Sequence, residues 1–119
     1  MKPPVIHWFE QQSAPRGTLA AAVRAADKST VGRAWNNAFT NDALDNALRC
    51  VADTFQILQA NGVALARMRL VYKNAWLHCE RGPDGSCLGI FTVANIEGYD
   101  AAALEKLFKQ FQVLSGIKR

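Results

Sequence analysis

The stretch from Arg67 to Glu80, RMRLVYKNAWLHCE, alternates polar and apolar side chains on both sides of Lys73-Asn74. A period of two around a two-residue turn predicts an antiparallel hairpin. The predicted pairs are Tyr72–Ala75, Leu70–Leu77 and Met68–Cys79 on one face, and Val71–Trp76, Arg69–His78 and Arg67–Glu80 on the other. Because the first face is entirely apolar, it belongs to the core. Two arginines on the second face indicate that water or another chain covers it.

The composition is that of a soluble globular protein. The chain has 119 residues, half of them hydrophobic and a fifth charged, so we expect a single domain over residues 1–119. The net charge of +4 is spread along the chain and does not demand nucleic acid. The sequence shows no signal peptide and no apolar run of membrane-spanning length. Three cysteines, far apart, favour a reducing compartment, and we expect a cytoplasmic protein without a membrane role.

A short helix and a first pair of strands are predicted before the long helix. Pro3-Pro4 precedes VIHWFEQQ, and proline suits the first helical position. The segment TLAAAVRAADKSTVGRAWN alternates around Asp27-Lys28-Ser29, which favours a hairpin. Its alanines also suit a helix, which is the competing interpretation. Small residues on both faces favour a strand that is covered on both sides.

The clearest helix runs from Asp42 to Asn61, with Thr40 or Asn41 as its cap and Gly62 after its end. An apolar stripe follows its length at steps of three and four. The stripe consists of Leu44, Leu48, Val51, Phe55 and Leu58, widened by Ala43, Ala47, Cys50 and Ile57. A stripe of this width can serve the chain's own sheet and a partner helix at once. The sequence does not decide which side of the helix meets the sheet.

One more strand and one more helix follow the hairpin. RGPDGS predicts a turn and CLGIFTVAN a strongly apolar strand. With a loop of two or four residues, Leu88, Ile90 and Thr92 would share the face of Leu77 and Cys79. The last helix begins near Asp100, carries an apolar face, and ends at Ser115-Gly116. That face consists of Leu104, Leu107, Phe108, Phe111 and Leu114.

The predicted order is α-β-β-α-β-β-β-α, an α+β fold with a five-stranded antiparallel sheet and helices on both faces. This order, with TLAAAVRAADKSTVGRAW and ARMRLVYKNAWLHCERGPDGSCLGIFTV, resembles the roadblock family. That family contains dynein light chains and bacterial GTPase regulators with a profilin-like layout. The resemblance extends from about Val5 to Leu114.

The resemblance implies a homodimer. Roadblock-like proteins pair the strand after the long helix with its copy, and the long helices pack together. Here that strand is 66–73 and that helix 42–61. The expected dimer interface consists of Leu48, Val51, Phe55, Arg67, Met68, Arg69, Leu70 and Tyr72. As an alternative, the arginines protect an edge strand from pairing.

The resemblance also implies a non-catalytic scaffold, regulator or adaptor that binds small Ras-like GTPases or motor subunits. We expect a partner-binding patch near the dimer interface, formed by Arg67, Arg69, His78 and Glu80.

An enzyme is not expected, nor is a metal or another cofactor. His78-Cys79-Glu80 contains the H-x-E half of the zinc deaminase signature, but the P-C-x-x-C half is missing. Neighbouring strand residues point to opposite faces, so His78 and Cys79 cannot bind one metal. His78 and Cys87 would share a face, which gives two ligands where zinc needs three or four.

The alternative function is a small-molecule sensor of the profilin-like or PAS-like kind. Trp8, Trp35 and Trp76 would line its pocket between sheet and helices, although core packing explains them equally well. Nucleic-acid binding would need an open sheet face with aromatic and basic residues, and it ranks below the sensor because helices cover both faces.

Overall fold

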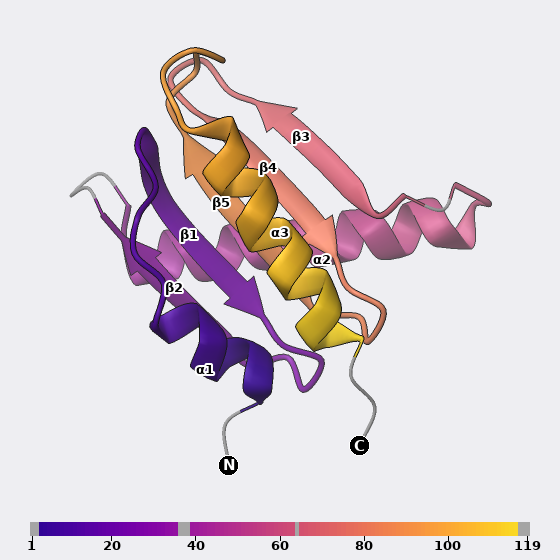
Figure 1. Cartoon of the computed structure of the whole chain (residues 1–119). Coiled ribbons are helices and arrows are strands. Elements are labelled where there is room, and N and C mark those ends of the chain that lie inside the picture. The colour runs from indigo at the N-terminus through magenta and orange to yellow at the C-terminus, as the bar shows by residue number, and fades with distance from the viewer. Residues whose placement is uncertain (1–2, 36–38, 64, 117–119) are drawn as a thin grey trace.

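The computed structural model describes residues 3–35, 39–63 and 65–116 and has the predicted order of elements (Figure 1). The elements are α1 (Pro4–Glu10), β1 (Thr18–Arg24), β2 (Thr30–Ala34), α2 (Asn41–Ala60), β3 (Arg67–Val71), β4 (Trp76–Arg81), β5 (Cys87–Thr92) and α3 (Ala101–Ser115). The strands form one sheet in the order β2-β1-β5-β4-β3, and every neighbouring pair is antiparallel. The predicted fold class is confirmed, and the alanine-rich segment is a strand rather than a helix.

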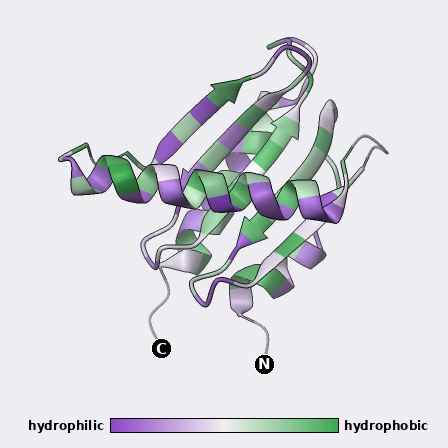
Figure 2. Cartoon of the chain, turned by 180° about the vertical axis from the view of Figure 1, so that it is seen from behind, coloured by the Kyte–Doolittle hydropathy of each residue, from purple (hydrophilic) through white to green (hydrophobic). Residues whose placement is uncertain are grey.

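Helices cover both faces of the sheet. α1 and α3 lie on one face, and α2 lies across the other, as the two opposite views show (Figures 1 and 2). Each face has its own apolar cluster. Phe9, Ile90 and Phe108 belong to the α1/α3 cluster, whereas Leu48 and Leu77 belong to the α2 cluster. The chain thus has two cores separated by the sheet.

The sequence of α2 explains its bounds and its orientation. The Thr40 hydroxyl accepts a hydrogen bond from the Ala43 amide at 3.1 Å, which caps the first turn. Gly62 follows the last turn with a φ of +83°. The buried residues of the helix are Leu44, Leu48, Val51 and Phe55, each at most 2% exposed. The stripe therefore meets the chain's own sheet, which answers the question that the sequence left open.

The hairpin of β3 and β4 has the predicted register. Arg67 pairs with Glu80 and Leu70 with Leu77. The Tyr72 amide donates to the Ala75 carbonyl at 3.0 Å, so Lys73-Asn74 is a two-residue turn.

The face predicted for β5 is wrong. Arg81 pairs with Cys87, so the connecting loop is residues 82–86, an odd length that inverts the strand's faces. The side chains of Leu88, Ile90 and Thr92 consequently lie on the face of His78, and Leu88 and Ile90 belong to the α1/α3 cluster.

The loop is stabilised internally, which explains its length. The Asp84 carboxylate accepts the amide and hydroxyl hydrogens of Ser86, and Gly85 has a φ of +89°. Because Cys87 now faces α2 while His78 faces α3, the prediction that these two share a face is also wrong.

Candidate interaction surface at the β3 edge

β3 is an edge strand whose outer backbone is open. In its ladder with β4, the Tyr72 amide donates to Ala75 and the Arg81 amide donates to the Ala66 carbonyl, at 3.0 and 2.8 Å. Bonded residues alternate in an antiparallel pair, so the backbone groups of Arg67, Arg69 and Val71 point away from β4. These groups can pair with a further strand.

Exposed apolar side chains concentrate around this edge. Among the described residues, seven large apolar side chains are exposed, and five of them lie between the last turns of α2 and the end of β3. These five are Ile57, Val63, Leu65, Val71 and Tyr72, with exposed fractions of 44–64%. Concentrated apolar surface of this kind marks protein–protein contacts.

Arg67 is held by its own domain. Its Nε donates to Glu80 Oε2 at 2.6 Å and its Nη1 to Glu105 Oε1 at 2.5 Å, and its guanidinium lies 5.2 Å from the centre of the Phe108 ring. Glu80 is only 5% exposed and also accepts a 2.8 Å hydrogen bond from Gln112 Nε2. These contacts raise the pKa of Arg67, chiefly through Glu105, and lower the pKa of the Glu105 carboxyl. The network fixes β3 to α3.

Arg69 and His78 form the second half of this surface. The Arg69 guanidinium lies 4.6 Å from the centre of the Trp76 ring, a cation–π contact. His78 Nε2 is 2.9 Å from Thr92 Oγ1, and its ring centre is 5.1 Å from that of Tyr99. Burial, reinforced by the nearby arginines, lowers the pKa of His78 to about 4. The imidazole is therefore neutral at pH 7.

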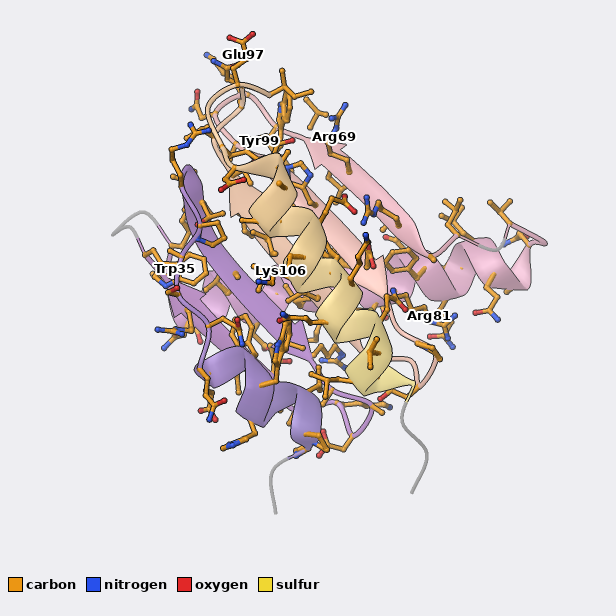
Figure 3. The ribbon with its side chains drawn as sticks, viewed as in Figure 1. Trp35, Arg69, Arg81, Glu97, Tyr99 and Lys106 are labelled. Carbon is orange, nitrogen blue, oxygen red and sulfur yellow. The ribbon has the colours of Figure 1, made fainter. Side chains whose placement is uncertain are left out.

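These groups border a cavity of about 500 Å³ between β3, β4 and the beginning of α3. Its polar and aromatic lining consists of Arg67, Arg69, His78, Tyr99, Glu105 and Phe108. Arg69 and Tyr99 lie toward the same end of the molecule (Figure 3). The volume suits a small ligand or a partner's side chain.

The described residues contain no group of three or more His, Cys, Asp and Glu side chains that could hold a metal ion. Burial raises the pKa of the Cys79 thiol to about 12 and that of Cys87 to about 11, so both remain protonated at neutral pH. Within the described ranges, no helix combines the length and apolarity needed to cross a membrane.

The predicted patch residues come together on one face of the β3–β4 hairpin. Arg67, Arg69 and His78 line the cavity, whereas Glu80 lies beneath Arg67 and holds it.

The predicted interface residues divide into three groups. Arg67, Arg69 and Tyr72 are exposed, and Met68 and Leu70 are half-buried toward α2. The remaining three, Leu48, Val51 and Phe55, are buried under the chain's own sheet. The free surface of the edge therefore does not include the side chains of these three.

Sequence reasoning missed two contributions to the surface. Glu105 and Tyr99 come from beyond β5, and no local pattern connects them with Arg67 or His78. Val63 and Leu65 lie between α2 and β3, where an apolar pair outside any helix or strand was the available signal.

The fold is similar to the crystal structure of a Roadblock/LC7 domain from Streptomyces avermitilis. The two share 14% sequence identity with a TM-score of 0.56, over 94% of this chain and 92% of that chain. No protein-family model and no curated protein matches the sequence. At this identity the likeness establishes the fold, and the resemblance to the roadblock family is confirmed at that level.

Proposed function

From the Roadblock/LC7 fold and its open β3 edge, we propose that this protein is a non-catalytic regulator or adaptor that homodimerises through β3. The partner protein that the family resemblance suggests is a small Ras-like GTPase. One observation carries the dimer: among the described residues, the outer backbone of β3 pairs with no other strand, and five of the seven exposed large apolar side chains lie around it.

Charge selects a register for the paired edges. A two-fold axis at Leu70 sets Leu70 against its own copy and Met68 against Tyr72, all on the apolar face. An axis at Arg69 would instead oppose two arginines, which is destabilising. In the Leu70 register only Arg67 faces a like charge, Lys73, and Glu80 and Glu105 already neutralise Arg67.

The positions of the arginines favour pairing over edge protection. Arg69 lies over Trp76, and Arg67 lies over Phe108 and bonds to Glu80 and Glu105. Both side chains thus lie over their own domain, which leaves the outer backbone of β3 accessible to another strand. A protective charge would project past the edge into solvent.

The oligomeric state tests this proposal. Size exclusion with light scattering should give the wild type twice its chain mass of 13.1 kDa. Leu70→Glu should give a folded monomer, because it places a carboxylate and its copy at the two-fold axis. Val113→Glu, at a 68% exposed position on α3, is the matched control and should remain dimeric. A monomeric wild type at high micromolar concentration would refute the dimer.

The GTPase part has a separate test. Calorimetry with a purified small Ras-like GTPase, loaded with GDP or a GTP analogue, should show binding that Arg69→Ala weakens. Arg49→Ala, at an exposed position on α2, should leave the affinity unchanged. If the GTPase binds the wild-type dimer in neither nucleotide state, the GTPase assignment is refuted. The proposal of a homodimeric adaptor is not affected by that result.

A small-molecule sensor is the second candidate, favoured by the cavity of about 500 Å³ beside β3. Arg69 and Tyr99 offer polar and aromatic contacts there, and the neutral His78 offers a hydrogen bond. A monomeric wild type would bring this candidate forward.

A further inference from the structure

A second cavity of about 510 Å³ lies on the other face of the sheet, beside α2. α2 crosses the sheet and leaves the ends of several strands uncovered beyond it (Figure 2). The cavity forms between that helix and two hairpin turns, β1–β2 and β4–β5. Its principal side chains are Arg24, Lys28, Asp53, Gln56, Arg81 and Cys87.

Two arginines stand in one row across three strands. Cys87 on β5 pairs with Arg24 on β1 and with Arg81 on β4. Paired residues point to the same face, so both arginines flank Cys87 on the α2 side, each about 4.8 Å from it across the ladder. Arg81 Nη1 donates to Gln59 of α2, which fixes that guanidinium against the wall of the cavity.

The two turns share one construction, in which an aspartate accepts hydrogen bonds from the serine two residues later. Asp27 accepts the amide and hydroxyl hydrogens of Ser29, and Asp84 does the same for Ser86. The residue between each pair has a positive φ, +73° at Lys28 and +89° at Gly85. The serine hydrogen bonds orient these carboxylates without cancelling their charge, and neither aspartate lines the cavity.

The side chains that line the cavity have an excess of positive charge. Its lining contains three cations, Arg24, Lys28 and Arg81, and one carboxylate, Asp53, so the net charge is +2. Arg24 and Lys28 make no ion pair and no side-chain hydrogen bond within residues 3–35, 39–63 and 65–116. Small apolar walls from Ala25, Ala52 and Ala60 complete the cavity.

We propose that this cavity binds a small molecule through a phosphate monoester group. Guanidinium groups match phosphate oxygens in geometry, and two of them line this cavity together with a lysine. A phosphate monoester carries a charge of about −1.5 to −2 at pH 7, which balances the lining. The volume suits a ligand of nucleotide or sugar-phosphate size. The proposal does not depend on the dimer, because no residue of β3 lines this cavity.

NMR titration of the full chain with AMP, pyrophosphate and adenosine tests the site. AMP and pyrophosphate should shift the amide signals of residues 24–28 and 81–87, and adenosine should not. Arg24→Gln should weaken AMP binding by about tenfold or more, because a charged hydrogen bond is lost. Arg49→Gln removes the same charge from an exposed position on α2 and should change the affinity by no more than about twofold.

Lys28→Gly separates binding from folding. Glycine suits the φ of +73°, so the melting temperature should not fall, while AMP binding weakens. The proposal is overturned if phosphate compounds leave these amides unshifted, or if Arg24→Gln and Arg49→Gln weaken binding equally. Equal binding of acetate would show an adventitious anion site only and would likewise overturn it.

Discussion

The two edges of the sheet are equally long and differ in what covers them. β2 lies between helices: Arg33 donates to the Glu10 carbonyl at 3.2 Å and to the Gln12 carbonyl, and Leu44 of α2 packs against Gly32. β3 has alternately exposed residues and is surrounded by exposed apolar side chains. The chain's own helices contact β2, whereas β3 is bordered by exposed apolar side chains.

This difference shows that the accessibility of an edge strand to another chain depends on the elements packed beside it as much as on the strand's own sequence. TVGRA in β2 and RMRLV in β3 both carry arginine and valine. The Arg33 guanidinium reaches α1 and its end, whereas those of Arg67 and Arg69 lie over α3 and β4. In the described part of the chain, β3 combines an edge position with a border of exposed apolar side chains.

The largest expected effect separates the two sides of α2. Phe55 is 2% exposed under the sheet, so Phe55→Ala should lower the free energy of unfolding by about 3–5 kcal/mol. Ile57 is 61% exposed near the β3 edge. In the monomeric Leu70→Glu background, Ile57→Ala should therefore lower the free energy of unfolding by less than about 0.5 kcal/mol. Urea denaturation measures both. Equal losses would contradict the assignment of Phe55 to the buried side of α2 and Ile57 to its exposed side.

A smaller effect compares the edges directly. A Cβ at Gly32 would lie 2.8 Å from Leu44 Cδ1, and Leu44 is fully buried. Gly32→Val on β2 should therefore destabilise the chain by about 1–2 kcal/mol, overpacking being partly offset by the lower entropy of the unfolded chain.

The matched change on β3 is Arg69→Val, where the side chain is exposed and only the contact with Trp76 is lost. It should cost at most about 1 kcal/mol in the monomeric background. Thermal unfolding compares the two variants. A larger loss of stability in Arg69→Val than in Gly32→Val would contradict the view that β2 is the more tightly packed edge.

A separate expected effect is pH-dependent and belongs to the β3 side. The pKa of His78 falls from 6.5 to about 4 on folding, so acid protonates the unfolded chain first. The free energy of unfolding should therefore decrease as the pH falls from about 6.5 to 4, and this contribution should level off below. His78→Gln should flatten the decrease, whereas His7→Gln, at an exposed position on α1, should not. An unchanged slope in His78→Gln would contradict the burial of a neutral imidazole.

Local patterns predicted the elements and the β3–β4 register because both depend on side chains close in sequence. The alternation around Lys73-Asn74 is enough to predict the pairs Arg67–Glu80 and Leu70–Leu77, which the structure has. The face of β5 was missed because it depends on a loop of odd length, which the bonds of Asp84 to Ser86 stabilise.

The surfaces were only partly predictable for the same reason. Arg67 meets Glu105 across 38 positions of sequence. The cavity beside α2 likewise joins Arg24, Lys28 and Arg81, which come close only when β1, β5 and β4 pair. The orientation of α2 was undecided because its apolar stripe is wider than the sheet requires.

Cysteine cross-linking tests the central claim, that two β3 edges pair around Leu70. In a Cys50→Ser background, which removes the exposed cysteine, Leu70→Cys should form a disulfide-linked dimer on mild oxidation. Opposed residues of a non-hydrogen-bonded pair have Cα atoms about 4.5 Å apart, within the disulfide range. Met68→Cys, facing Tyr72 of the copy, should remain unlinked. Efficient linking through Arg69→Cys instead would refute this register, and a monomer with no linking at any of the three positions would refute the edge interface itself.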